Sequence, residues 1–479
     1  MSWREQRNSW TILAVSSATA VLGYYSYYYQ WQAKQKKKET PKLPRRLPTS
    51  REDAKCLQPL TLPCGLTLKN RIVRAAAFGG SDIDSLLQTH VEVAEGGVAM
   101  TTVAYASVSQ DGMTFANQIL LAQQNFLPDL QKLADAVHAK GSMLSLQLAH
   151  AGSFATASVT GTQTIAPSGI FNIAGFDFAR AMTRDDMDRV AADFLRAACM
   201  AQEAGCDAVE LHCGHGYLLS QFLCPATNTR TDEFGGASIE NRLRFPLRVL
   251  REIRKTVTIA VLVKMNLSDG FDGLSIDDAK AAAVAFGKAG ADALVLSGGF
   301  TSRNGFYMLR GTVPYWSMAR ALGATKGLAL LLLGRWLVPR IDFEECFFLQ
   351  QARHVLGVLQ DNNNNLRHVP VCLIGGVVSL SGIEGVLEEG FHLVQMARAL
   401  IQNPRMVRDI EESLPLLSSS SSTIKTSNQT KATTSAAVND VRSKCTHCNE
   451  CVVSTIDPTR VMHCPIKETQ PQDDNKLDW

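Results

Sequence analysis

The sequence predicts an α/β protein whose main domain is a (β/α)8 TIM barrel. Short apolar segments alternate eight times with amphipathic helical segments, a pattern typical of parallel strands covered by helices. Glycine follows several helical segments, as in EAGCDAVEL, KAGADALVL and EEGFHLVQM, where it is expected to end the helix. The predicted strands are residues 72–77, 98–103, 143–148, 208–212, 260–265, 293–297, 371–374 and 393–397.

The segments between these strands predict the rest of the barrel. Residues 61–71 predict a small hairpin, and the clearest helices are 185–204, 238–255 and 276–289. The interval 305–370 is long for one barrel unit and contains the apolar run GLALLLLGRWLV at 327–338. This run is too short to span a bilayer. We expect it to form a helix that packs on the barrel or lines an access channel.

The composition is that of a globular protein with a packed core. The chain has 479 residues, of which 46% are hydrophobic and 19% charged, and this excludes disordered, collagen-like and disulfide-dense classes. A net charge of +3 is too small to argue for a nucleic-acid partner. Eight of the twelve cysteines are scattered, several within apolar runs, which suits a reducing compartment.

The N-terminus predicts a membrane anchor. Residues 10–29 (WTILAVSSATAVLGYYSYYY) carry no charge and are long enough for a helix to cross a bilayer of roughly 30 Å. Five tyrosines at the end of this segment suit an aromatic interface belt, and the basic run 34–38 suits the cytoplasmic side. We therefore expect one anchoring helix with the catalytic domain facing the cytosol. A cleaved signal peptide, targeting to an organelle such as the mitochondrial membrane, and a disordered tail stay open as alternatives.

Four segments follow from these patterns. Residues 1–55 form the anchor and a basic linker, and residues 56–415 form the barrel. Residues 416–442 are rich in Ser and Thr and predict a flexible linker, and residues 443–479 form a short Cys-rich tail.

The polar residues with the clearest chemical meaning follow the fourth predicted strand. His212 ends this strand, and His215 and Tyr217 follow in the next turns. Barrel enzymes carry their sites at the C-terminal ends of the strands, so these side chains should converge. The histidines can donate hydrogen bonds to a carbonyl or hold an anionic group, and Tyr217 can protonate a carbon that has received a hydride. A metal site at this HxxH spacing lacks a nearby acidic partner. The remaining alternative is that His212 and His215 are loop residues without a catalytic role.

Several separated motifs together resemble the Old Yellow Enzyme family of FMN-dependent oxidoreductases. The resemblance covers roughly residues 57–412 and is strongest to the branch of 2,4-dienoyl-CoA reductase and the bacterial NADH:flavin oxidoreductases. The motifs that carry it are LKNRIVRAAA (68–77), LSLQLAHAG (144–152), HGYLLSQFL (215–223), NTRTDEFGG (228–236), IGGV (374–377) and VQMARALIQNP (394–404).

The resemblance implies a set of FMN-binding residues. Gln147 matches a contact to the flavin pyrimidine edge, and Lys264 would place a cation near that edge, where many relatives have Arg. Glycine pairs let the backbone approach the flavin phosphate, and Arg398 would grip it. The first two strands would pass along the flavin, although relatives often have Pro and Met at two of the alanine positions. The implied residues are Ala75, Ala76, Ala77, Val103, Gln147, Lys264, Gly298, Gly299, Gly375, Gly376, Ala397 and Arg398.

The resemblance also implies the reaction. No GxGxxG motif follows any strand, so NADH or NADPH would enter the same pocket as the second substrate. Hydride would pass from NAD(P)H to FMN and then to an electron-poor alkene of a hydrophobic substrate, with Tyr217 as the proton donor. An iron–sulfur flavoprotein similar to trimethylamine dehydrogenase is one alternative. A non-catalytic, membrane-tethered barrel is another, but it predicts the loss of site residues that are all present.

Four cysteines crowd the C-terminal tail. Cys445, Cys448, Cys451 and Cys464 are spaced C-x2-C-x2-C-x12-C, which suits a [4Fe–4S] cluster or zinc. Members of the Old Yellow Enzyme family that carry extra flavin domains hold an iron–sulfur cluster after the barrel. The spacing of their cysteines is usually C-x2-C-x3-C. The shorter gap and the missing FAD domain leave a set of reduced thiols as the third possibility.

Overall fold

The computed structural model describes residues 47–122, 124–172, 177–270, 273–338, 340–416, 438–455, 457 and 462–467. Within these ranges no helix combines the length and apolarity that a bilayer span requires. The predicted anchor at 10–29 and most of the predicted linker at 416–442 lie outside the described residues.

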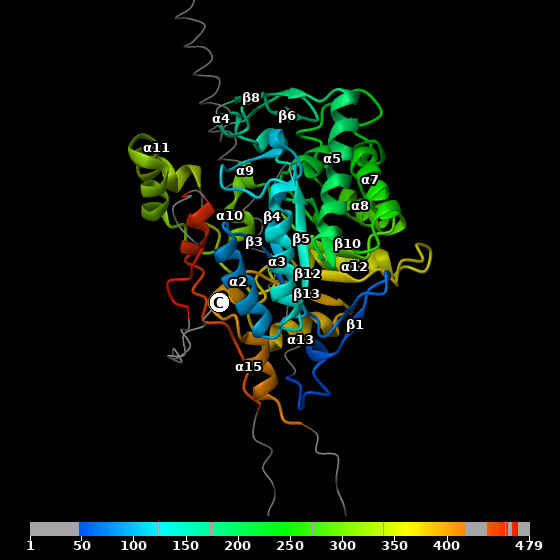
Figure 1. Cartoon of the computed structure of the whole chain (residues 1–479), viewed down its shortest axis with the longest axis vertical. Helices are drawn as coiled ribbons and strands as arrows, with labels where there is room; N and C mark the ends of the chain where they lie inside the picture. Colours follow the sequence, from blue (N-terminus) through cyan, green and yellow to red (C-terminus); the bar gives the residue numbers. More distant parts are fainter. Residues whose placement is uncertain are drawn as a thin grey trace, which may run out of the picture.

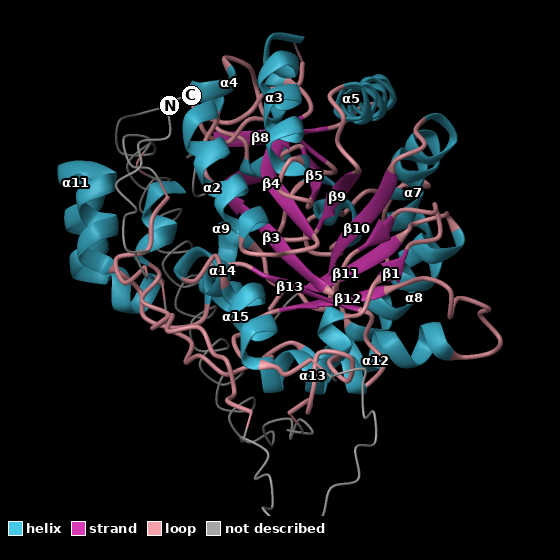
Figure 2. Ribbon diagram, turned by 60° about the horizontal axis from the view of Figure 1, so that its bottom comes forward, coloured by secondary structure: helices cyan, strands magenta, loops and turns pink. Residues whose placement is uncertain are grey.

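Eight parallel strands close into a barrel, as the sequence predicts. The strands follow one another around the barrel in the order β3, β4, β5, β9, β10, β11, β12 and β13, and β13 pairs with β3. Figure 2 shows them as an inner ring covered by helices. The strands are β3 Ile72–Phe78, β4 Met100–Ser107, β5 Met143–Ala149, β9 Ala208–Cys213, β10 Ala260–Asn266, β11 Ala293–Ser297, β12 Val371–Ile374 and β13 Leu393–Met396.

The helices begin and end where the side chains can satisfy their terminal backbone groups. Thr183 and Ser275 form capping boxes at the starts of α5 and α8. The glycines expected to end helices, Gly205, Gly290 and Gly390, all have positive φ. The helices are α2 Ile83–Glu95, α3 Leu127–His138, α4 Ala157–Thr160, α5 Arg184–Glu203, α6 Leu218–Leu223, α7 Ile239–Thr256, α8 Ile276–Lys288, α9 Thr301–Asn304, α10 Phe306–Leu309, α11 Tyr315–Leu337, α12 Leu349–Gln360, α13 Leu380–Glu388, α14 Arg398–Gln402 and α15 Met406–Ser413.

A hairpin closes the N-terminal end of the barrel. It consists of β1 Leu60–Thr61 and β2 Thr67–Leu68, which pair antiparallel in the predicted position. Leu62 and Leu68 are buried in one cluster with inward-facing residues from the barrel strands. Because apolar side chains fill this end, the polar site is left to the C-terminal ends of the strands.

Two additions surround that C-terminal end. The β5–α5 connection forms a small sheet of β6 Ile165–Ala166, β7 Ile170–Asn172 and β8 Asp177–Ala181, seen at the top of Figure 1. The C-terminal segment runs back along the barrel, where Arg442 bridges to Ser379 and Ser443 donates its backbone N–H to Val378 at 2.9 Å. This segment contains a 3-10 turn, η5 Glu450–Thr455.

The apolar run at 327–338 lies in helix α11, which confirms the predicted helix. The helix does not pack on the barrel as we expected. Leu328, Leu332 and Leu333 are exposed, and α11 stands at the edge of the molecule, away from the ring of barrel helices (Figures 1 and 2). The two arms of α11 meet at Gly323, whose φ of 78° breaks the helix. The arms pack on each other instead of on the barrel, since a Cβ at Gly327 would lie 2.2 Å from the Ala319 carbonyl oxygen.

Gly96, at the end of α2, provides a test of the packing around the barrel. A Cβ at this position would lie 1.8 Å from the Pro404 carbonyl oxygen, a backbone atom that cannot easily move. We expect Gly96→Ala to lower the free energy of unfolding by about 1–3 kcal/mol.

Gly357→Ala is the matched control, because its Cβ would meet nothing within 4 Å in α12. It should raise stability by about 0.5–1 kcal/mol through helix propensity. Urea denaturation of both variants measures the difference, and equal stabilities would contradict the described contact.

Candidate active site

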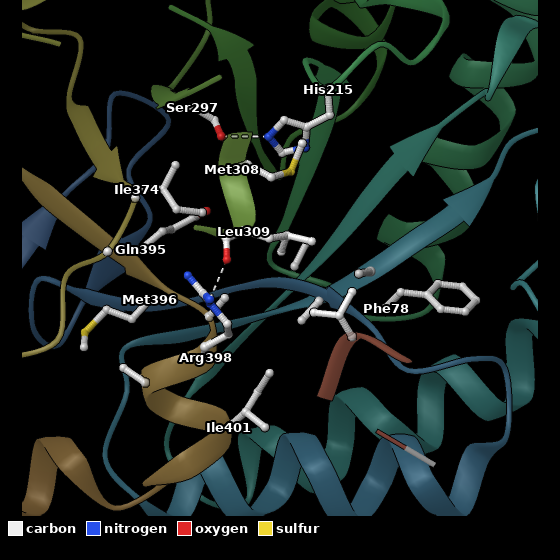
Figure 3. A pocket seen from close by; sticks show the side chains of 18 of the residues that line it. Phe78, His215, Ser297, Met308, Leu309, Ile374, Gln395, Met396, Arg398 and Ile401 are labelled. Carbon is white, nitrogen blue, oxygen red and sulfur yellow. Dashed lines mark hydrogen bonds between the residues drawn. The ribbon is translucent and has the colours of Figure 1, made fainter. Parts of the chain in front are cut away.

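The C-terminal ends of the barrel strands open into one pocket, shown in Figure 3. Its wall combines residues from the strands, from the β11–β12 connection and from the C-terminal segment. Most of the predicted site residues lie on this wall: Ala76, Ala77, Gln147, His212, His215, Tyr217, Lys264, Gly375, Gly376, Ala397 and Arg398.

Two predicted strand residues face away from the pocket. Ala75 and Val103 are fully buried in the barrel wall, and Ala104 lines the pocket in place of Val103. The pairing of β3 with β4 shifts register between Arg74 and Ala77, and a second shift follows in β4. Such irregularities re-aim side chains, so simple alternation along the strand misplaces them.

Gly298 and Gly299 are also absent from the described pocket wall. They allow aromatic side chains to approach the backbone after β11. A Cβ at Gly298 would lie 3.1 Å from the Phe348 ring, and one at Gly299 would lie 3.1 Å from the Tyr307 ring.

A buried carboxylate that the sequence analysis overlooked organises the floor of the pocket. Glu210 on β9 is fully buried, and its Oε1 lies 2.7 Å from Lys264 Nζ. Gln147 donates to the same oxygen at 2.7 Å, and Gln395 donates to Oε2 at 2.7 Å. The two predicted flavin contacts, Gln147 and Lys264, are therefore held in place by one acid.

The strand pattern contained a signal for Glu210. It lies two residues before His212, and residues i and i+2 of a strand point to the same face. A glutamate directly after the apolar pair Ala208–Val209 of a buried strand has to be paired. This combination could have identified Glu210 as an inward-facing partner of the site.

Local backbone geometry places His215. This residue has φ of 57°, and the following Gly216 has φ of 78°. A Cβ at Gly216 would lie 2.4 Å from the Phe300 ring, so the turn requires glycine here. The backbone N–H of His215 donates to Asn266 Oδ1 at 3.0 Å, which ties the turn to the end of β10.

The three predicted catalytic side chains stack together. The Tyr217 ring lies on the His212 ring with centroids 4.4 Å apart, and His215 meets His212 edge-on at 4.9 Å. His215 Nε2 lies 2.7 Å from Ser297 Oγ, a hydrogen bond drawn in Figure 3. Tyr105 packs edge-on against Tyr217 at 5.0 Å. The sequence prediction that these three side chains converge is therefore confirmed.

Burial sets the protonation of these groups. Desolvation, with smaller contributions from His215 and Lys264, holds the pKa of His212 well below its usual range. Burial and Lys264 lower the pKa of His215 to about 3. Burial and the neighbouring Tyr105 raise the pKa of Tyr217 well above its usual value. All three groups are therefore neutral at neutral pH: two imidazoles and a phenol that keeps its proton.

Arg398 lies at the other end of the pocket and binds the C-terminal segment. Its Nη1 donates to the carbonyl oxygens of Leu309 and Arg310 at 2.7 and 2.8 Å and to Asn449 Oδ1 at 2.6 Å. The bond to Leu309 is drawn in Figure 3. His447 and Cys451 from the same segment line the pocket.

Three of the four predicted metal ligands lie near Arg398. Cys445, Cys448 and Cys451 interact electrostatically with Arg398. Among the described residues, however, no group of three or more His, Cys, Asp or Glu side chains is arranged to hold a metal ion. Cys464 interacts electrostatically with the other three cysteines, so the four thiols lie in one neighbourhood. The cluster and the zinc site stay predictions, and no step below passes through either.

Comparison with known proteins agrees with this geometry. The profile of the NADH:flavin oxidoreductase / NADH oxidase family matches residues 55–294. The chain belongs to this family. It is therefore an FMN-dependent oxidoreductase, as the motifs in the strand ends predict, and NAD(P)H is the family's co-substrate.

Relatives of this flavin oxidoreductase cover different shares of its length. A 4,4'-dithiodibutanoate disulfide reductase of Rhodococcus erythropolis is 36% identical over 84% of this chain and 93% of its own. A probable NADH-dependent flavin oxidoreductase of Bacillus subtilis is 32% identical over 42% of this chain, and the match spans about half of the Bacillus protein, 55%.

Solved structures share the barrel of the flavin oxidoreductase. A 2-naphthoyl-CoA reductase complex superposes with a TM-score of 0.65 at 21% identity, covering 86% of this chain and 56% of that one. The old yellow enzyme homologue of Zymomonas mobilis gives 0.57 at 21% identity, covering 76% and 94%. At these identities the likeness shows the fold alone.

The pocket residues of the flavin oxidoreductase fit FMN. His212 Nδ1 and Gln395 Oε1 are buried and have no hydrogen-bond partner among the described residues, so both can bind a ligand. Gly375 and Gly376 have φ of 122° and 79° and present backbone rather than side chain after β12. Gln147 and Lys264 would hold the polar edge of the flavin ring.

The ion pair beneath the site gives a testable prediction. Glu210→Leu should lower the free energy of unfolding by about 3–5 kcal/mol, because it leaves Lys264 buried without its anionic partner. The paired change Glu210→Leu with Lys264→Met removes both charges and should recover most of that loss. Chemical denaturation compares them, and a double variant as unstable as the single one would show that the charge pairing is not what matters.

The buried histidines predict a pH-dependent stability. Because His215 has a folded-state pKa of about 3, only its unfolded form takes up a proton as pH falls below about 6.5. The contribution of His215 to the free energy of unfolding is therefore complete above about pH 6.5 and is lost progressively towards pH 3. The midpoint of thermal unfolding should fall between about pH 7.5 and 5.5, and His215→Asn should flatten this slope. An unchanged slope in the variant would contradict the assignment.

Proposed function

We propose that the enzyme transfers hydride from NADH or NADPH, through bound FMN, to an electron-poor alkene conjugated to a carbonyl group. The observation that supports this proposal is the stack of His212, His215 and Tyr217 on the wall of the pocket. When bound, FMN supplies reversible hydride chemistry. The nicotinamide and the acceptor would use the pocket in turn.

The two histidines would bind the carbonyl oxygen of the acceptor. Each neutral imidazole has one N–H to donate and one nitrogen that accepts. His212 Nδ1 is free of protein partners among the described residues, and His215 is fixed by Ser297 and by its own turn. Pre-organised donors aimed at an oxygen stabilise the negative charge that develops there during hydride transfer.

Tyr217 would protonate the carbon next to the carbonyl group. Its raised pKa keeps the phenol protonated at neutral pH, so it can act as a general acid. Stacking on His212 and contact with Tyr105 fix the direction of the ring. Lys264 and Gln147, held by Glu210, would hold the flavin ring in the same pocket, so that the hydride passes to one alkene carbon of the acceptor while Tyr217 supplies the proton to the other.

An organic disulfide is the second candidate acceptor. The relative from Rhodococcus erythropolis is named as a disulfide reductase, and its 36% identity spans 93% of that protein. Hydride transfer to one sulfur releases the other as a thiolate, and a protein acid such as Tyr217 can protonate it. The pocket wall offers Met308, Phe343 and Phe347 to an apolar substrate of either class.

We also propose that the N-terminal segment anchors the enzyme in a membrane with the catalytic domain facing the cytosol, with a mitochondrial membrane as the alternative. The uncharged run 10–29, its tyrosines and the basic run 34–38 support this location. The near-neutral net charge of +3 supports a small-molecule substrate rather than a nucleic acid.

A two-step kinetic experiment tests the proposed reaction. Anaerobic NADH or NADPH should bleach the flavin bands, and an enone should then restore them. In Tyr217→Phe we expect bleaching at the normal rate and restoration slowed by about 10²–10⁴-fold, since only the second step needs the acid.

Tyr105→Phe is the control, because it removes a hydroxyl from the neighbouring ring and should slow restoration far less. Restoration by a dialkyl disulfide but not by an enone would replace the alkene with the second candidate. A protein that is not bleached by either nicotinamide would contradict the proposal.

A further inference from the structure

Helix α11 carries an apolar surface that the described residues do not cover. Trp316, Leu328, Leu332 and Leu333 are 77%, 59%, 70% and 53% exposed. These four make up half of the large hydrophobic residues that are exposed in the described part of the chain; the others are Phe171, Phe178, Leu416 and Ile466. A concentration of this kind on one element marks an interaction surface.

The packing of the two arms of α11 on each other leaves its apolar surface exposed to solvent. Gly327 and Gly334 let its two arms pack together, since their Cβ atoms would meet Ala319 and the Tyr315 ring. Tyr315 also donates its hydroxyl proton to the Val338 carbonyl oxygen at 2.8 Å, which joins the ends of the hairpin. The two glycines are thus used between the arms, and Trp316 and the three leucines are left exposed.

The charge of α11 indicates what binds there. Residues 315–338 contain three basic residues, Arg320, Lys326 and Arg335, and no Asp or Glu. Arg340, which follows the helix, pairs with Asp342 at 3.1 Å. Arg320 and Lys326 are exposed beside the leucines. Exposed Trp and Leu on a helix that also exposes cations are typical of helices that lie in the interface of a membrane with anionic lipids.

We propose that α11 docks on the surface of an anionic lipid bilayer, with its leucines in the interface and its cations at the lipid headgroups. A second copy of the chain fits this surface poorly, because a symmetric contact would bring two purely cationic helices together. This site is separate from the predicted anchor at 10–29, and it holds the folded domain in one orientation.

The orientation places the pocket next to the membrane. Met308 and Leu309 precede α11, Phe343 and Phe347 follow it, and all four line the pocket. Resting on the proposed function, this geometry points to a lipophilic acceptor that enters from the bilayer past the base of α11.

Site-specific photocrosslinking in the full chain tests the docking. A benzophenone amino acid replaces Leu332, and in a matched control it replaces Leu416, which follows α15 and is 66% exposed. Helix α15 lies at the opposite end of the molecule from α11 (Figure 1). The vesicles are phosphatidylcholine with about one-third phosphatidylglycerol. We expect lipid adducts at position 332 to exceed those at 416 several-fold and to decrease in vesicles of phosphatidylcholine alone.

The other outcomes overturn the proposal. Adducts to a second copy, or to the chain's own N-terminal segment, would identify a different occupant. Equal labelling at 332 and 416 would show that α11 does not dock.

A pair of variants separates docking from catalysis. Leu328→Asp with Leu332→Asp should leave bleaching by NADH or NADPH unchanged in solution but slow turnover of an enone embedded in vesicles several-fold. Leu416→Asp should alter neither rate. A loss of bleaching in the unmodified protein would instead contradict the proposed function, so the two failures are distinguishable.

Discussion

The buried carboxylate of Glu210 is the interaction on which the arrangement of the pocket depends. An unpaired charge inside the barrel would be strongly destabilising, so it has to be compensated by donors from the surrounding strands. Lys264, Gln147 and Gln395 provide them from β10, β5 and β13. Four of the eight strands are thereby held in a common register just below the site.

The barrel interior has an apolar layer and a polar layer, and Glu210 lies between them. Below Glu210 the interior is apolar and is closed by the hairpin of β1 and β2. Above it, one step along the same face of β9, lies His212. Burial is the main cause of the lowered pKa values of His212 and His215, and the Lys264 cation lowers them further. Lys264 thus serves both the packing of the barrel interior, through Glu210, and the neutral state of the two histidines.

Most of the barrel could be predicted from the sequence because its signals are local. All eight strands lie where the apolar segments placed them, and three glycines end helices as expected. The errors arise where position depends on distant contacts. Val103 was expected beside the flavin, but the register shift in β4 turns Ala104 to the pocket. The packing of the C-terminal segment on Arg398 joins residues about fifty positions apart, which no local pattern reveals.

The pocket thus has two parts with different origins. The barrel strands supply the carboxylate of Glu210, the cation of Lys264 and the amides of Gln147 and Gln395, and the pairing of the strands fixes their positions. The opposite wall comes from the β11–β12 connection and the C-terminal segment, and Arg398 joins them by bonding Leu309, Arg310 and Asn449. Because α11 belongs to that same connection, a partner bound to α11 would lie next to this wall of the pocket. Acceptor choice should therefore depend on this wall, while the strand ends set the chemistry.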